Sequence, residues 1–149
     1  KKVFLLKGDT EDVKKVIQEY TDELKKHPID LACIGIGENG HIAFNDPPVA
    51  DFNDSKWVKL VALDEACKNQ QIGEGWFSTM DDVPKQALTL TITAILNCKT
   101  ISCVVPDERK AQAVYNTLYQ PISTECPATI LRKHTDTRFF LDRGAASKL

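Results

Sequence analysis

Residues 31–48, LACIGIGENGHIAFNDPP, place a glycine-rich turn directly after an apolar run. Residues 30–36 are apolar on both sides of a predicted strand, which is typical of a central strand in a parallel sheet. Pro47 and Pro48 would end any helix within two turns of Gly40. The stretch therefore predicts a buried strand that leads into a tight loop at the edge of a sheet.

The rest of the chain alternates strand-like and helix-like patterns. Further strands are expected over residues 3–7, 57–63, 87–92, 100–105 and 137–141. Helices are expected from a capping turn at 8–10 to 27–28, over 64–71, over 93–97, from 106–107 to 118, and over 127–131. This order predicts one α/β domain over residues 1–149, with a mostly parallel sheet and flanking helices in a Rossmann-like, three-layer arrangement.

The composition narrows the classes of function. The 149 residues are 42% hydrophobic and 27% charged, with a formal net charge of −2. Lysine and arginine are scattered, which argues against a nucleic-acid partner or a membrane surface, and the apolar runs are too short to span a bilayer. The five cysteines are odd in number and form no CxxC pair, so we expect reduced core thiols and a cytoplasmic protein.

The glycines of the loop have the spacing of a dinucleotide-binding turn. Gly35, Gly37 and Gly40 match GxGxxG, but such a turn needs a helix that opens at the third glycine and holds a pyrophosphate at its N-terminus. Only six residues separate Gly40 from Pro47, so a full helix does not fit there. A nicotinamide or flavin cofactor is therefore not expected.

The same loop can instead present His41 to a ligand. Open parallel sheets bind ligands beyond the carboxyl ends of their strands, and histidine carries protons well near neutral pH. Asn39 and Asp46 flank His41, and each could orient one ring nitrogen. The loop is therefore a candidate acid–base site. The alternative is a loop histidine that only bonds a backbone carbonyl, and the spacing alone does not decide between them.

Three segments resemble the glucosamine-6-phosphate deaminase family, also called isomerases. IGIGENGHIAFNDPP, residues 34–48, is similar to the family signature, in which glycines precede His-Ile and a Phe-Asn-acid-Pro run follows. DVPKQALTLTI, residues 82–92, and CVVPDERKAQAV, residues 103–114, resemble two later family segments. The resemblance covers almost the whole chain and implies that residues 1–149 correspond to the C-terminal half of the family's fold.

The resemblance implies a reaction and roles for individual residues. The family converts glucosamine 6-phosphate and water to fructose 6-phosphate and ammonia, with no metal or organic cofactor. His41 would assist opening of the sugar ring, and Asp46 and Asn39 would orient it. Lys110 would bind the substrate phosphate, and Gly37 would let the backbone approach the substrate. The partner is then a small sugar phosphate. Family members are often oligomers, so a homo-oligomer is left open.

The sequence also departs from the family pattern. Asp46 replaces a glutamate and is one methylene shorter, so its reach to His41 is a question for the structure. An arginine that often precedes the family's aromatic pair is absent before Trp76-Phe77, where Glu74 would repel a phosphate if it faced one. Gln70 or Gln71 is a candidate substitute, and the aromatic pair itself is expected to pack in the core or in a loop.

The family's N-terminal half carries a phosphate loop and the aspartate that removes the C2 proton, and this chain shows neither motif. We therefore expect the isolated chain to isomerise the substrate poorly, because a general base contributes about 10²–10⁴-fold to rate. Two alternatives stay open. One is a related sugar-phosphate enzyme such as a 6-phosphogluconolactonase, whose signature fits residues 42–45 less well. The other is a sugar-phosphate-binding fragment without catalytic activity.

Overall fold

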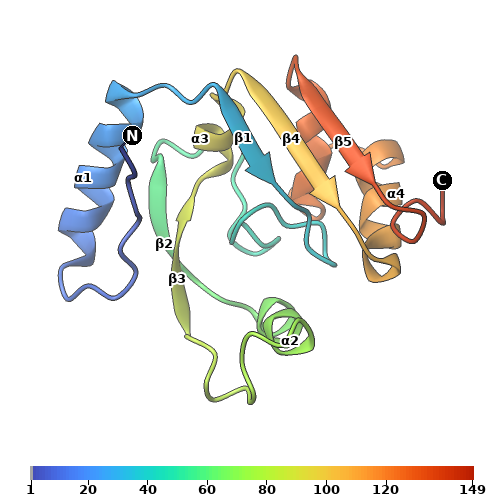
Figure 1. Ribbon diagram of the computed structural model, residues 1–149, viewed down its shortest axis with the longest axis horizontal. Helices are drawn as coiled ribbons and strands as arrows, with labels where there is room; N and C mark the ends of the chain where they lie inside the picture. Colours follow the sequence, from blue (N-terminus) through green and yellow to red (C-terminus); the bar gives the residue numbers. More distant parts are fainter. Residues whose placement is uncertain (1) are drawn as a thin grey trace.

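The computed structural model describes residues 2–149 (Figure 1). Its helices and strands, in chain order, are α1 (Val13–Lys26), β1 (Leu31–Ile34), β2 (Val58–Ala62), α2 (Glu65–Gly73), β3 (Gln86–Leu90), α3 (Ile92–Leu96), β4 (Thr100–Val105), the short 3-10 helix η1 (Glu108–Lys110), α4 (Ala111–Tyr119), the 3-10 helix η2 (Pro127–Lys133) and β5 (Thr137–Leu141). The α/β class predicted from the sequence is confirmed.

A parallel sheet in the order β1-β4-β5 forms the centre of the molecule. On β4, the side chains of Ile101, Cys103 and Val105 are almost fully buried. They belong to one hydrophobic core with side chains of α4 and η2, which cover this face of the sheet (Figure 1). Because neighbouring parallel strands end at the same edge, the loops after β1 and β4 emerge side by side, and both carry candidate site residues.

Side-chain caps fix where the helices begin. Asp12 accepts a hydrogen bond from the backbone N–H of Lys15 (3.0 Å) at the start of α1, and Asp64 accepts one from Cys67 (2.7 Å) at the start of α2. Such caps contribute about 0.5–2 kcal/mol each. The predicted cap of the first helix at 8–10 is wrong, because the aspartate that satisfies the first turn lies two residues later.

β2 and β3 form a separate antiparallel pair beside the parallel sheet, and α1 packs against β2 (Figure 1). A smaller hydrophobic cluster lies under this pair, made of Val61, Leu63, Cys67 and Val83. The predicted strands at 57–63 and 87–92 are confirmed, but they depart from the expected parallel arrangement. Although the connection between them carries α2, the chain returns in the opposite direction, with Val58 opposite Leu90 and Ala62 opposite Gln86.

The predicted buried strand over residues 3–7 is wrong. Val3 and Leu5 are each 75% exposed, and the segment has no strand partner among residues 2–149. It runs instead along α1, where the Tyr20 hydroxyl donates to the Phe4 carbonyl (3.4 Å) and the Phe4 ring stacks on His27. An apolar pattern forms a strand only where a neighbouring strand supplies hydrogen bonds.

The strand predicted to be central is at the sheet edge. β1 pairs only with β4 among the described residues. The sheet face opposite α4 and η2 is open, since Leu31, Val104 and Phe140 on three adjacent strands are 50–53% exposed. The parallel sheet with flanking helices is confirmed, while in residues 2–149 those helices cover this sheet on one face instead of the two that three layers require.

All five cysteines are free, which agrees with the expectation of reduced thiols. Four are buried, and burial raises the pKa of Cys103 to about 12. Cys33 is the exception, because it lies exposed on β1. Among residues 2–149, no helix combines the length and the apolar character needed to cross a membrane.

The corrected placement of residues 3–7 has a consequence for stability. Leu131 is fully buried in the main core, whereas Leu5 is 75% exposed. We expect Leu131→Ala to lower the free energy of unfolding by about 2–5 kcal/mol and Leu5→Ala to change it by less than about 0.5 kcal/mol. Urea denaturation of both variants measures the difference. Equal losses would show that residues 3–7 belong to the core.

Candidate active site

The glycine loop after β1 is a compact turn closed by backbone hydrogen bonds. The N–H of Gly37 donates to the carbonyl of His41, and the N–H of Gly40 donates to the carbonyl of Gly37 (both 3.0 Å). Gly40 has φ +84°, a backbone conformation that favours glycine. Its carbonyl accepts from Ala128 (2.8 Å), which ties the loop to η2.

The structure confirms that the glycines do not open a dinucleotide-binding helix. Within the described residues 41–57 the chain makes turns and an isolated bridge between Ile42 and Asn45. The pyrophosphate of a dinucleotide would have no helix N-terminus to bind at this loop. The loop instead positions a side chain.

His41, Asn39 and Asp46 form a closed set of hydrogen bonds. Nδ1 of His41 lies 2.9 Å from Oδ1 of Asp46 and 2.8 Å from Oδ1 of Asn39. The amide of Asn39 donates to the same Asp46 oxygen (2.9 Å), and its carbonyl oxygen also accepts from the backbone N–H of His41 (3.0 Å). The shorter Asp46 side chain therefore does reach His41.

This geometry fixes the protonation of the neutral imidazole. Both side-chain atoms next to Nδ1 are acceptors, so the ring carries its proton on Nδ1 and leaves Nε2 as an acceptor. Asn39 and Asp46, the two predicted orienting partners, both contact Nδ1 and so share one ring nitrogen. The alternative of a ring bonded only to a backbone carbonyl is also wrong, because the observed partners are an amide and a carboxylate.

Asp46 is 1% exposed and charged. Burial acts to raise its pKa, but the hydrogen bonds from His41 and Asn39 and the charge of His41 outweigh burial and lower the pKa below its usual range. The thiol of Cys67 acts in the same direction. Burial and the neighbouring Asp46 raise the pKa of that thiol to about 12, so it stays protonated. The site thus keeps a negative charge behind His41 at neutral pH.

Gly37 provides the space for the imidazole ring. A Cβ atom added to Gly37 would overlap the ring atoms Cε1, Nδ1 and Nε2 of His41. Gly37 also lines the cavity that His41 faces. Its predicted role in binding substrate stays a prediction, while the structure gives it a clear role in positioning His41.

Lys110 follows β4 and is 7% exposed, so it is not a solvated helix lysine. The turn before it is strained, because Asp107 has φ +87°, a conformation that costs a non-glycine residue about 1–3 kcal/mol. The Asp107 side chain holds the turn by accepting from the backbone and guanidinium of Arg109, and Asp142 accepts from the Asp107 N–H (3.0 Å). This turn directs Lys110 inward, while Arg109 stays half exposed.

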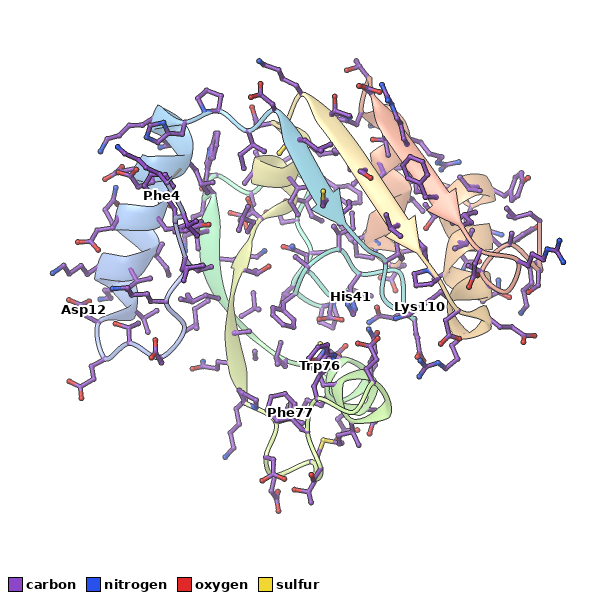
Figure 2. All side chains as sticks on the ribbon, in the orientation of Figure 1. Phe4, Asp12, His41, Trp76, Phe77 and Lys110 are labelled. Carbon is purple, nitrogen blue, oxygen red and sulfur yellow. The ribbon has the colours of Figure 1, made fainter. Side chains whose placement is uncertain are left out.

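His41 and Lys110 line one cavity of about 660 Å³ at the carboxyl ends of β1 and β4. Figure 2 shows the two side chains on neighbouring segments below these strand ends. Gly37, Gln70 and Glu74 line the same cavity, whereas Asn39 and Asp46 lie behind His41 and do not. The volume is in the range of small-molecule sites, and the structure brings the residues predicted from the sequence to one place.

Two residues that hold the loop in place, one of which also lines the cavity, were not singled out from the sequence. Asn45 donates to the carbonyls of Ile42 and Leu90 (both 2.8 Å), and Thr89 accepts from the N–H of Phe44 (3.1 Å), so β3 anchors the loop. Asn45 and Thr89 lie inside the segments that resemble the family, which is the signal that could have found them.

The segment after α2 differs in part from expectation. Phe77 packs on the smaller cluster as predicted, but Trp76 is 71% exposed and does not pack. Gln70 lines the cavity, while Gln71 faces a different one. Glu74 does face the cavity, and its carboxylate lies 3.4 Å from the ammonium of Lys110.

Comparison with known proteins places this geometry in a family. The model of the glucosamine-6-phosphate isomerases/6-phosphogluconolactonase family matches residues 1–140. The chain belongs to this family. Its members include glucosamine-6-phosphate deaminases from Listeria monocytogenes serotype 4a, 37% identical over 149 residues, and from Streptococcus agalactiae serotype III, 39% identical over 142 residues. The chain spans 62% and 59% of the lengths of these two family members.

Solved structures of the family agree with the fold. A monomeric glucosamine-6-phosphate deaminase superposes with a TM-score of 0.90 at 33% identity, over 98% of this chain and 59% of that one. The 6-phosphogluconolactonase from Leishmania guyanensis gives a TM-score of 0.68 at 20% identity, over 91% of this chain and 53% of its own. The second likeness shows the shared Rossmann-like fold alone.

The space at Gly37 generates a prediction. We expect Gly37→Ala to displace the His41 ring and to lower the free energy of unfolding by about 1–3 kcal/mol, since an extra methyl overpacks the site. Gly8→Ala is the matched control, because nothing lies within 4 Å of a Cβ there. Urea denaturation, with the NMR shifts of the His41 ring, measures both effects. An unmoved ring in Gly37→Ala would contradict the proposed packing.

The lowered pKa of Asp46 predicts a pH dependence. The folded pKa lies below the unfolded value of about 3.9, so the contribution to stability is present above that value and is lost as the pH falls through the folded pKa. We expect Asp46→Asn to lose stability at pH 7 and to depend less on pH below about 4 than the unchanged chain. Unfolding free energies at pH 7 and pH 3 give the comparison. Parallel pH profiles would contradict it.

Proposed function

We propose that the chain forms the proton-transfer and phosphate-binding part of a glucosamine-6-phosphate deaminase, which converts glucosamine 6-phosphate and water to fructose 6-phosphate and ammonia. The observation that carries the proposal is a His41 ring whose Nδ1 is held by Asp46 and Asn39, in one cavity with the buried Lys110. The deaminases at 37–39% identity support the choice of reaction.

His41 has the geometry for opening the sugar ring. Ring opening moves the proton of the anomeric hydroxyl to the ring oxygen as the bond between C1 and that oxygen breaks. Nε2 accepts the first proton and delivers a proton to the ring oxygen, so no proton is gained or lost overall. The Asp46 carboxylate stabilises the imidazolium in between, because it lies 2.9 Å from Nδ1. Asn39 holds the ring and the carboxylate in register.

Lys110 is the proposed ligand of the substrate phosphate. Its ammonium is a compact cation in a low-exposure position, which favours a dianionic group over water. A sugar phosphate held there would extend along the cavity toward His41, which lies on the adjacent loop (Figure 2). A small sugar phosphate is thus the proposed partner of the site.

The later proton transfer at C2 is assigned by the family resemblance to groups outside this chain. We propose that residues 1–149 form one domain that corresponds to the C-terminal half of the relatives, of which the chain spans 62% and 59%. A cytoplasmic location is part of the same proposal, and the five free cysteines support it.

An ammonia-release assay with glucosamine 6-phosphate, performed on the complete gene product that contains this chain, tests the proposal. We expect His41→Gln to lower kcat by about 10²–10⁴-fold, because the proton carrier is lost. Lys110→Met is expected to raise KM for the phosphorylated substrate more than it lowers kcat, because it removes a binding charge.

The matched control is His27→Gln, since His27 is exposed at the C-cap of α1 and does not line the cavity. It should leave kcat and KM unchanged. No ammonia release, or release that is insensitive to His41→Gln, would reject the proposal. Hydrolysis of 6-phosphogluconolactone without deamination would favour the lactonase function instead.

A further inference from the structure

Glu74 is held at the mouth of the cavity by three hydrogen-bond donors. The Gln70 amide donates to Oε1 (2.8 Å), the Trp76 indole N–H donates to Oε2 (3.3 Å), and the Lys110 ammonium lies 3.4 Å from Oε1. The Glu74 side chain is 28% exposed, and that of Lys110 is 8% exposed. The Glu74 carboxylate therefore contacts Lys110, the cation that the proposed function assigns to the substrate phosphate.

The surroundings of Glu74 have the chemistry of an anion site. The amide of Gln70, the indole N–H of Trp76 and the ammonium of Lys110 are all donors. Each contacts the carboxylate through a nitrogen that donates and does not accept. Gln70 bonds on its other side, since its carbonyl oxygen accepts from the N–H of Glu38 (3.2 Å) in the glycine loop. The same donors could serve a phosphate oxygen if the carboxylate left.

We propose that Glu74 is an internal occupant of the anion subsite, which the substrate phosphate must displace from Lys110 and Gln70 before it binds. This inference rests on the proposed function, because it takes Lys110 as the phosphate ligand. Glu74 then determines how tightly the cavity binds an anion and which anions it binds. It takes no part in proton transfer at His41.

The chain around Glu74 allows it to move. Glu74 is the C-cap residue of α2, and it lies between Gly73 and Gly75. Gly75 has φ +80° with no atom within 4 Å of an added Cβ, so space surrounds the backbone there. Rotation about the side-chain bonds of Glu74 would carry the carboxylate away from Lys110. The backbone N–H groups of Glu74 (2.9 Å), Gly75 (2.9 Å) and Trp76 (3.0 Å) would keep their hydrogen bonds to carbonyls of α2.

The ionisation of Glu74 agrees with this role. Burial acts to raise its pKa, but the hydrogen bond from Gln70 and the charge of Lys110 outweigh burial, and the pKa is lowered. The carboxylate is therefore charged at neutral pH and opposes an incoming phosphate by repulsion as well as by occupying its donors.

Trp76 offers an optical signal for the displacement. Trp76 is 71% exposed, and its indole N–H donates to Glu74, which lines the cavity. The chain has two tryptophans, so a Trp57→Phe background leaves Trp76 as the single fluorophore. Loss of the bond to Glu74 should change its emission when an anion enters.

The test is a calorimetric titration of inorganic phosphate into the chain and its Glu74→Gln variant at neutral pH, with Trp76 emission followed in parallel. We expect Glu74→Gln to bind phosphate roughly tenfold more tightly, since a partly exposed opposing charge is removed. Phosphate should shift the emission of Trp76 in the unchanged chain, and the shift should be much smaller in Glu74→Gln. Glu65→Gln is the matched control, because it removes the same charge from the other end of α2, and it should leave the affinity unchanged.

Lys110→Met separates the two proposals. Loss of phosphate binding in Glu74→Gln/Lys110→Met supports both. If Glu74→Gln binds phosphate no more tightly than the unchanged chain while Lys110→Met still raises KM in the ammonia assay, Glu74 is not an occupant of the subsite and the proposed function stands. If Glu74→Gln tightens binding and Lys110→Met does not weaken it, the anion binds elsewhere and both assignments are wrong.

Discussion

The hydrogen bond between Nδ1 of His41 and the Asp46 carboxylate determines the rest of the site. It puts the ring proton on Nδ1 and so leaves Nε2 available to a substrate. The bond requires a buried charge, which the surrounding donors stabilise against the cost of burial. It also requires the ring to lie flat against the backbone of Gly37, where no side chain fits. The hydrogen bond between His41 and Asp46 therefore also explains why residue 37 is a glycine.

The parallel sheet brings His41 and Lys110 to one cavity. The loop with His41 follows β1, and the turn with Lys110 follows β4, which pairs with β1 although residues 35–99 separate the two strands in the chain. Parallel neighbours end at one edge, so the two loops meet there. β3 supports the His41 loop from the side, because it accepts hydrogen bonds from Phe44 and Asn45, and its residues Thr89 and Leu90 line the cavity.

Local patterns in the sequence were sufficient for most elements and for His41 as a candidate site residue, whereas Lys110 was predicted only from the family resemblance. Strands β3 and β4 contain β-branched residues, and α1 has apolar residues at helical spacing, so these elements agree with the pattern although the cap of α1 does not. Residues 3–7 and the edge position of β1 could not be predicted, because both depend on which strand lies next to them. The sharing of Nδ1 by Asn39 and Asp46 depends on the loop's conformation, which the spacing does not contain.

Two separate carboxylates contact Lys110 and His41. The cation at Lys110 is neutralised by a carboxylate from α2, while the charge of Asp46 acts on His41 from behind and does not line the cavity. The proposed proton-transfer loop and the proposed anion subsite therefore have different electrostatic partners, which come from different segments. Substitutions in the segment from α2 to Trp76 can then retune which anions enter, while the His41 ring keeps its proton on the same nitrogen.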